Sequence, residues 1–520
     1  MDIGLNTAYT GLVAAKTGLY TLSHNIGNAG RYGYSRQQIS QRATSAHYMY
    51  KDGFLGTGTD IYNVERIRDD YLDFKFRNET AYMNDWDVKN RNLDEVQKTL
   101  SEPSNASFRR YLEDFYGSIE NLSKNSGDVS YRQPMIENGA AMCKHINETY
   151  SKLELHQRGI LKDVQDSVDK VNQLARDIAN LNKQIAMLEI DGRTANDLRD
   201  QRDVKIDELS KYAFLTVKEV DTLEQNSANP NEQYLDKKPI KHLDISIGGI
   251  SLVHHGYYNQ IKLKETKDDP VVPWNQADKT IKDGHVAYEL QWENTGKVNL
   301  TGGKLKGLMD TYNGNGEHNS FRGIRFYKNK LNEFAYHFTK KFNKIHREGY
   351  TLGSDKEKSH NGENFFEEID ESRKNTAAFD MAVRNKIKNN PNLIAASDKE
   401  GAGPENNVNL RRMLGNGVGG REDNRFFSEG VSQGAPEDFI KSVISFVGVD
   451  KNQMERFYKT ENLLVNSLSQ RRLSVSGVEA NEEMGDMVKF QQVYKASARM
   501  ISTLDQLLDV TVNRLGMAGR

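Results

Sequence analysis

The two ends of the chain carry apolar residues at the spacing of an amphipathic helix. Near the start, seven apolar residues recur at alternating steps of three and four and so share one helical face: Leu5, Ala8, Leu12, Ala15, Leu19, Leu22 and Ile26. Near the end, five residues repeat at strict intervals of seven, flanked by Ala498, Leu504 and Val512: Met487, Tyr494, Ile501, Leu508 and Leu515. An isolated helix with an exposed apolar stripe is only marginally stable. We therefore expect the terminal helices to pack against each other or against another chain.

Four further helices are predicted after the first, at 69–100, 108–122, 134–189 and 196–209. The third of these has a heptad repeat of a and d positions: Ile160, Val164, Val171, Leu174, Ile178, Leu181, Ile185 and Leu188. At 1.5 Å per residue this helix would be on the order of 80 Å long, which predicts a rod-like molecule. The heptads favour packing inside the subunit's own bundle over a coiled coil between subunits.

The pattern of the middle of the chain is that of strands. Alternating residues at 243–247 and 250–253 flank Gly248-Gly249, as in a two-residue hairpin, and 286–292 predicts another strand. Helical periodicity returns at 305–345, and again at 436–473 and 481–515. Residues 34–64 are interpreted as a linker with a short strand, and 349–434 as irregular. The predicted fold class is mainly α with a β-containing middle domain, in an elongated multidomain bundle of long helices whose N- and C-terminal helices are paired.

Composition supports this shape and narrows the expected partners. The 520 residues suggest three or four folding units, with 37% hydrophobic and 28% charged residues. Lys+Arg number 71 and Asp+Glu 73, with no long block of one sign, so neither nucleic acid nor a membrane is an expected partner. The single cysteine, Cys143, excludes an intramolecular disulfide. No apolar run is long enough to span a bilayer, and Met1–Thr10 lacks the features of a cleaved secretory signal.

The sequence presents no candidate catalytic, cofactor-binding or metal-binding residue. His242, His254 and His255 lack a carboxylate or cysteine at metal-ligand spacing, which favours a solvated strand. Residues 310–317 and 415–420 lack the ligand pattern of a calcium loop or a phosphate loop. No nucleophile elbow or zinc-protease motif occurs. We therefore predict that the protein is not an enzyme, and we interpret the charged segment 197–203 as a solvated or locally paired helix face.

Several segments resemble flagellar axial proteins. Ser23-His24-Asn25-Ile26-Gly27-Asn28 and Gly33-Tyr34-Ser35-Arg36-Gln37 are similar to the N-terminal signature shared by rod, hook and hook-associated proteins. Residues 476–483 and 490–498 are similar to their C-terminal signature. Three interior segments resemble the hook-associated protein 1 family: 196–203, 302–308 and 331–346 followed by Phe365-Phe366. One departure is Ala29-Gly30-Arg31-Tyr32, where many relatives carry Thr-Pro, so that turn must be made differently.

This resemblance implies a subunit that joins hook to filament. It implies paired terminal helices as an inner tube (1–42 and 478–520), a mainly helical bundle around it (43–215 and 303–477) and a β-rich outer domain (216–302). The implied partners are other copies of the chain in a ring, the hook protein, the second junction protein (hook-associated protein 3) and an export chaperone on the C-terminal helix. The resemblance also implies unfolded export through the flagellar type III channel to an extracellular site. A chain without disulfides is suited to such a route.

The terminal stripes are the candidate assembly interface, because an axial assembly would place its contacts at the two ends of the chain. The residues assigned to it are Leu5, Leu12, Leu19, Leu22, Ile26, Met487, Tyr494, Ile501, Leu504, Leu508 and Leu515. A hook or rod subunit is an alternative that would share both terminal signatures but lack the interior segment 196–203 and the long heptad helix. A cytosolic coiled-coil scaffold is an alternative of a different class, and it would form stable soluble oligomers with ordered termini.

Overall fold

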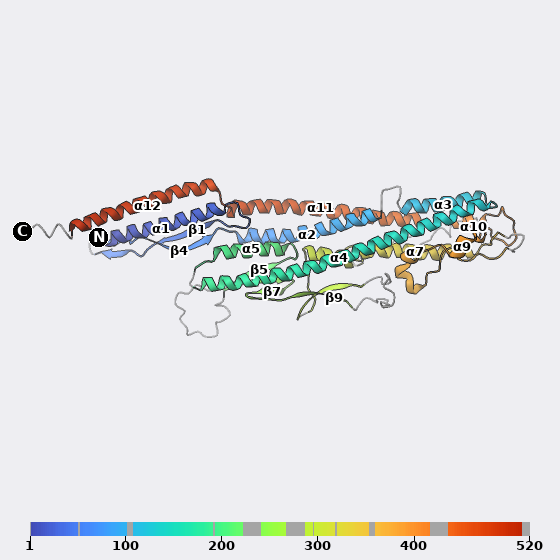
Figure 1. The fold of residues 1–520 in the computed structure, drawn as a ribbon, viewed down its shortest axis with the longest axis horizontal. Helices are drawn as coiled ribbons and strands as arrows, with labels where there is room; N and C mark the ends of the chain where they lie inside the picture. Colours follow the sequence, from blue (N-terminus) through green and yellow to red (C-terminus); the bar gives the residue numbers. More distant parts are fainter. Residues whose placement is uncertain are drawn as a thin grey trace, which may run out of the picture.

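Long helices that run roughly along one axis give the molecule its elongated shape (Figure 1). The computed structural model describes residues 2–49, 53–100, 108–190, 193–221, 241–266, 286–294, 296–317, 320–352, 359–415 and 435–511. The longer helices are α1 (Asp2–Asn28), α2 (Asp70–Thr99), α3 (Phe108–Lys124), α4 (Arg132–Glu189), α5 (Asn196–Ser210), α7 (Ile324–Arg347), α11 (Pro436–Ser476) and α12 (Ala480–Asp509). The predicted fold class, mainly helical with a small β region in the middle, is confirmed.

The heptad helix α4 forms the long axis of the body. Its 58 residues would span roughly 87 Å. Most of its heptad side chains are buried inside the subunit: Ile160, Val164, Val171, Leu174, Ile178 and Ile185. Because they are buried within a single subunit, these side chains belong to the subunit's own core, as predicted. Burying each of them stabilises the fold by about 1.5–3 kcal/mol. Leu181 is only partly buried, and Leu188, at the end of the helix, is 60% exposed.

The segment 302–308 shows why glycine occurs at two of its positions. Gly303 has a φ of +94°, and a Cβ there would lie 2.4 Å from the carbonyl oxygen of Tyr212. Gly307 lies in α6 (Lys304–Asn313), and a Cβ there would lie 2.8 Å from the carbonyl oxygen of Asp85 in α2. Both positions exclude a side chain, and so α6 packs directly on the backbone of its neighbours.

The β region lies along one side of α4 (Figure 1). Four antiparallel strands form one sheet in the order β5 (Thr216–Asp221), β6 (Lys241–Ile247), β7 (Ile250–His254) and β8 (Tyr257–Tyr258), and β9 (Ile261–Glu265) pairs separately with β10 (Tyr288–Trp292). The predicted hairpin joins β6 to β7. Its Gly248 and Gly249 have φ values of +58° and +88°, which matches a turn that requires positive φ at both central residues.

The segment interpreted as a linker with a short strand is instead a β structure that packs on α1. The short strand at Ile61 and Val64 is confirmed, but the linker interpretation was wrong. It contains β1 (Gln37–Ala43), β2 (His47–Met49), β3 (Gly53–Leu55) and β4 (Thr59–Arg66). β1 and β4 pair antiparallel along their whole length. Polar side chains of α1 hold this hairpin: Asn6 Nδ2 donates to the Thr57 carbonyl at 3.1 Å, and Thr10 Oγ1 accepts from the Thr59 amide at 3.3 Å. Only Ile61 and Val64 of β4 gave a strand signal, because β1 reads Gln-Gln-Ile-Ser-Gln-Arg-Ala, without apolar alternation, and β2 and β3 have three residues each.

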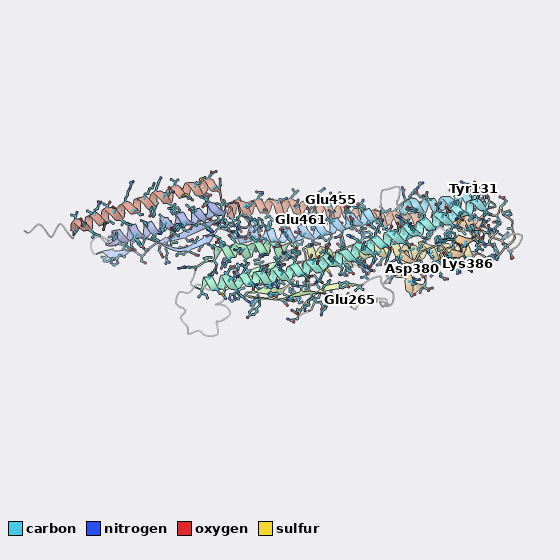
Figure 2. All side chains as sticks on the ribbon, viewed as in Figure 1. Tyr131, Glu265, Asp380, Lys386, Glu455 and Glu461 are labelled. Carbon is cyan, nitrogen blue, oxygen red and sulfur yellow. The ribbon has the colours of Figure 1, made fainter. Side chains whose placement is uncertain are left out.

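The described part of 349–434 forms a cap at the end of the molecule opposite α1 and α12, where Figure 2 labels Lys386. It contains η3 (Glu371–Thr376), α8 (Ala377–Asp380), α9 (Asn385–Asn389), η4 (Pro391–Leu393) and α10 (Val408–Met413). Buried asparagines of the long helices bond its backbone. Asn343 of α7, for example, donates to the Phe366 carbonyl at 3.0 Å and accepts from the Phe366 amide at 2.9 Å. Such bonds specify an irregular chain without any hydrophobic period.

His346 makes the cap sensitive to acid. The ring is fully buried at the end of α7, where Nδ1 donates to the Glu363 carbonyl and Nε2 accepts from the Ala395 amide at 3.1 Å. Burial lowers its pKa from 6.5 to about 4. Between these values the unfolded chain binds a proton that the folded chain does not. The contribution of the neutral His346 ring to the free energy of unfolding is therefore complete above about pH 6.5. It falls as the pH drops toward 4, by up to about 3 kcal/mol.

We expect this loss to disappear when the titrating group is removed. Urea unfolding of the wild type and of His346→Gln between pH 7.5 and 4.5 should give free energies of unfolding that converge as the pH falls, because only the wild type loses the contribution of a neutral buried imidazole. The exposed His47→Gln variant is the control and should follow the wild type. Parallel curves for the wild type and His346→Gln would contradict the assignment.

Candidate functional site

The first and last long helices, α1 and α12, pack antiparallel and are called here the terminal helix pair (Figure 1). Glycines spaced seven apart on α1 face side chains spaced seven apart on α12: Gly4 opposite Leu504, Gly11 opposite Ser497 and Gly18 opposite Phe490. The approach is closest at Gly18, where a Cβ would lie 2.8 Å from the Phe490 ring. The seam therefore depends on small residues of α1, which allow the two helices to approach closely.

The residues predicted for the assembly interface lie along this pair, and pairing covers them only in part. Leu22 is buried, whereas most of the others are half-buried: Leu5, Leu12, Leu19, Ile26, Met487, Ile501, Leu504 and Leu508. Tyr494 is exposed, and Leu515 lies outside the described residues. Sequence reasoning missed the three glycines, although their interval of seven residues was visible beside the leucine stripe.

A second set of apolar side chains on the same two helices faces solvent. On α1 these are Tyr9, Val13 and Tyr20, with exposed fractions of 60%, 40% and 66%. On α12 they include Val493, Met500 and Leu507, with exposed fractions of 49%, 56% and 49%. Scattered exposed apolar residues are normal on any protein, but these residues are aligned at helical spacing on each of the two helices.

Buried polar groups connect the terminal helix pair to the chain that follows α1. The fully buried Glu483 of α12 accepts a hydrogen bond from Asn25 Nδ2 at 2.8 Å, and its Oε1 lies 2.6 Å from Arg36 Nε. Asn25 Oδ1 accepts from the Tyr34 hydroxyl at 2.8 Å and from the Gln37 amide at 3.0 Å. Burial, together with nearby carboxylates, raises the pKa of Tyr34, so this hydroxyl stays protonated and able to donate.

A buried set of ion pairs and hydrogen bonds, the neck network, continues from there into the body. It comprises Ser35, Arg66, Arg68, Asp73, Arg77, Asp200, Asp203, Asp207 and Arg472. Ser35 donates to Asp200 through its amide at 2.9 Å and its hydroxyl at 2.7 Å. Arg66 Nη1 lies 2.7 Å from a carboxylate oxygen of both Asp200 and Asp203. Burial alone would raise the pKa of Asp203, but Arg68, Arg66 and Arg77 hold it below its ordinary value.

Arg472 of α11 completes the neck network on its other side. Its Nε lies 2.7 Å from Asp73 Oδ1 in α2, and its Nη2 donates to Asp207 Oδ2 in α5 at 2.7 Å. The predicted solvated face at 197–203 is therefore wrong for Asp200, Arg202 and Asp203, which are buried and paired with residues far away in sequence. Pairs so distant in the chain leave no local pattern.

Three segments that the sequence singled out as separate signatures thus meet at one place. Asn25, Ser35 and Arg36 come from the N-terminal signature, Asp200 and Asp203 from the interior segment, and Glu483 from the C-terminal signature. The Arg36 amide also donates to the carbonyl of Ser476, the last residue of α11, at 2.8 Å. Both connections between the terminal helix pair and the body are therefore anchored to the same groups.

The described residues offer little support for metal chemistry. No group of three or more His, Cys, Asp or Glu side chains in the described ranges could hold a metal ion. His242 and His255 stack face to face, with ring centroids 3.9 Å apart, a geometry that does not direct their nitrogens at one ion. None of the described helices is long and apolar enough to cross a membrane.

Known proteins match the chain along most of its length. A family model described as the flagellar hook-associated protein FlgK helical domain matches residues 93–366, which is 274 of 520 residues, and the flagellar basal body rod FlgEFG protein C-terminal model matches residues 469–515. Flagellar hook-associated protein 1 of Bacillus subtilis (strain 168) is 27% identical over 100% of this chain and 99% of its own length. The protein of the same name from Escherichia coli (strain K12) is 23% identical over 98% of this chain and 99% of its own.

A solved structure shares the fold. The flagellar hook junction protein FlgK from Burkholderia pseudomallei has a TM-score of 0.54 at 12% sequence identity, and the match covers 78% of this chain and 100% of that one. Together, the terminal helix pair, the long helical body and these matches define a flagellar axial protein. The chain belongs to the flagellar hook-associated protein FlgK family. Members of this family act at the hook–filament junction, and the chain has a structural role in the bacterial flagellum.

We expect Asp203→Ala to destabilise the protein strongly. The substitution leaves Arg66, Arg68 and Arg77 with too few partners in a buried site, at a cost of about 3–5 kcal/mol in the free energy of unfolding. Urea unfolding of the purified chain measures this value. Glu455→Ala removes a carboxylate from an exposed pair with Lys459 on α11 and is the matched control, with little effect expected. Equal effects of the two variants would show that the neck network does not stabilise the fold.

We expect Gly18→Ala to weaken the terminal helix pair. Alanine would favour an isolated helix by up to about 1 kcal/mol, but a Cβ 2.8 Å from Phe490 forces the helices apart, which typically costs 1–3 kcal/mol. A net loss of about 1 kcal/mol should make α1 amides exchange hydrogen roughly fivefold faster. Gly27→Ala, where a Cβ would have no neighbour within 4 Å, is the control and should not speed exchange. Faster exchange in both variants would refute the seam.

Proposed function

We propose that copies of this chain form a ring that joins hook to filament, and that the terminal helix pair is the part that assembles. The observation that carries this proposal is the pair of apolar stripes on α1 and α12 that remain exposed after the two helices have packed together. Residues 1–42 and 478–520 would form the inner tube, 43–215 and 303–477 the surrounding bundle, and 216–302 the outer domain. The β1–β4 hairpin spans residues 37–66 and so lies on both sides of the first boundary.

The same proposal extends to the partners. The ring would contact the hook protein on one side and the second junction protein, hook-associated protein 3, on the other. The apolar side chains of α12 that end up in these contacts would need cover before assembly, which is the reason to place an export chaperone on that helix. The chain would pass unfolded through the type III channel and fold outside the cell, without a cleaved signal peptide. The ion pairs of the neck network form without any covalent step, which suits folding after export.

A purely structural role needs no catalytic residue, and the relatives are structural flagellar proteins. A hook or rod subunit is the less supported alternative, because the family model for the FlgK helical domain covers the α4 heptads and segment 196–203. A cytosolic coiled-coil scaffold is disfavoured because most α4 heptad side chains are buried within the subunit, so they are not available to form a coiled coil with a second chain.

The placement can be tested on isolated flagella from the source bacterium. Antibody–gold labelling read by electron microscopy should give one band at the boundary of hook and filament. Label along the whole hook or the rod would favour the axial alternative, and protein confined to the cytosol would favour the scaffold.

We expect Leu504→Asp to reduce incorporation into flagella. Leu504 lies against Gly4 in the seam, with a side-chain carbon 3.7 Å from the position of a Cβ on that glycine, and a carboxylate there loses water on pairing. A cost of about 2 kcal/mol lowers the paired fraction by a factor of up to roughly 30. Immunoblots of isolated flagella measure incorporation. Leu155→Asp, at a 71% exposed position on α4, is the matched control. Normal incorporation of Leu504→Asp would show that assembly does not depend on the terminal helix pair.

A further inference from the structure

The cap contains a buried positive charge at the start of α4. Arg132 is the first residue of this helix and follows Tyr131, which Figure 2 labels at the cap end of the molecule. Its side chain is fully buried and makes no ion pair with any residue that the structure describes. Burial lowers its pKa to about 10, so the guanidinium stays charged at neutral pH. A buried charge without a counter-charge is destabilising, and an anion beside Arg132 would relieve that cost.

The hydrogen bonds of Arg132 do not supply that counter-charge. Nη1 donates to the Ile394 carbonyl at 2.8 Å, and Nη2 donates to the Ser126 carbonyl at 3.2 Å. Both acceptors are neutral. Nε is buried as well and has no hydrogen-bond partner among the described residues. A guanidinium has more N–H donors than these two bonds use. The charge of Arg132 and part of its hydrogen-bonding capacity are therefore unsatisfied within the described chain.

Arg132 lies in the wall of a cavity in the cap that has a volume of about 300 Å³, called here the cap cavity. The wall also contains a second cation, Lys399, and three residues with hydroxyl groups, Tyr350, Thr351 and Ser397. None of the described residues that line it is a carboxylate. One water occupies about 30 Å³ in the liquid, so a small ion fits this space together with part of its hydration shell.

The charge of the cap cavity is that of an anion site. Lys399 is exposed and makes no ion pair within the described ranges. Its sequence neighbour Asp398 does not line the cavity and instead accepts a hydrogen bond from Asn406 Nδ2 at 2.9 Å. The positive end of the α4 dipole adds to the field, because the N-cap residue of α4 makes no side-chain hydrogen bond to the helix. Two positive side chains without a negative one match the charge of a divalent oxyanion such as sulfate or hydrogen phosphate.

We propose that the cap cavity binds one small divalent oxyanion, phosphate or sulfate, between Arg132 of α4 and Lys399 of the cap. The ion would neutralise Arg132 and connect the first residue of α4 to the irregular chain that covers it. A carboxylate carries a single charge and would leave one of the two cations unmatched. An ion that binds only the folded chain stabilises it by mass action. The cavity lies at the end of the molecule opposite the terminal helix pair, so this inference goes beyond the proposed function and does not rest on it.

Calorimetric titration of the purified full-length chain with inorganic phosphate tests the inference, in a buffer free of phosphate and sulfate at constant ionic strength. We expect saturable binding of one phosphate per chain. Lys399→Gln removes the exposed cation and should weaken binding roughly tenfold, a usual effect of losing a hydrogen bond to a charged group. Lys388→Gln is the matched control, because it changes another exposed lysine of the cap that does not line the cavity, and it should bind phosphate as the wild type does.

Hydrogen exchange measures what the ion does to the cap. Phosphate at about one hundred times its dissociation constant should slow the exchange of cap amides by up to about a hundredfold and leave the amides of β9 and β10 unchanged. Arg132→Gln retains an amide donor but has no charge, so it should abolish this dependence on phosphate. Phosphate also stabilises proteins in general by exclusion from their surface. Equal slowing in the cap and in β9 would therefore be a salt effect and would overturn the inference.

Three further results would contradict the oxyanion site. Absence of phosphate binding would mean that Arg132 is neutralised within the chain. Equal weakening in Lys399→Gln and Lys388→Gln would mean that phosphate binds elsewhere on the cap. Acetate that binds as tightly as phosphate would mean that the cavity does not select a divalent ion. Because Lys399 is exposed, its variant tests the site even where Arg132→Gln does not fold.

Discussion

Asp203 lies among three arginines at the point where the helical body meets the terminal helix pair, and every one of these charges is largely removed from water. A charge in such a place must have a partner, because desolvation costs several kcal/mol per ion. Each partner here comes from a different element: Arg66 from β4, Arg77 from α2 and, through Asp207, Arg472 from α11. The network can be satisfied only when all these elements lie in one arrangement. It therefore specifies where the body ends and how the terminal helices leave it.

The terminal helix pair follows a different physical logic. Its seam contains glycines, which cost helix stability but allow close approach, and much of the larger apolar surface of both helices stays outside. The seam is aligned by a single buried carboxylate, Glu483, which receives Asn25 and Arg36. A subunit of this design can orient its ends firmly through polar contacts and still offer apolar surface to a neighbour. That combination suits the assembly after export that we propose.

The body and the cap are stabilised by contacts within the subunit. The heptads of α4 bury their side chains against the subunit's own elements, which gives a stiff rod that needs no second chain. The β region lies along that rod, and the cap is held by asparagines and by the neutral ring of His346. The exposed apolar stripes of α1 and α12, which we propose as the assembly surface, thus lie at one end of the molecule, and the opposite end is stabilised by contacts within the subunit.

The sequence by itself determined the elements with a strong hydrophobic period: the terminal helices, the α4 heptads, the Gly248-Gly249 hairpin and the mixed, elongated fold class. It also supplied the family signatures. Tertiary structure alone decided that β1 and β4 pair as a hairpin on α1, that Asp200 and Asp203 are buried, and that Gly4, Gly11 and Gly18 form the seam. The physical reason is the separation in sequence of the residues that interact. A periodic stripe records how a segment divides between core and solvent, whereas Ser35 and Asp200 are 165 residues apart in sequence, and their pairing exists only once the chain has folded.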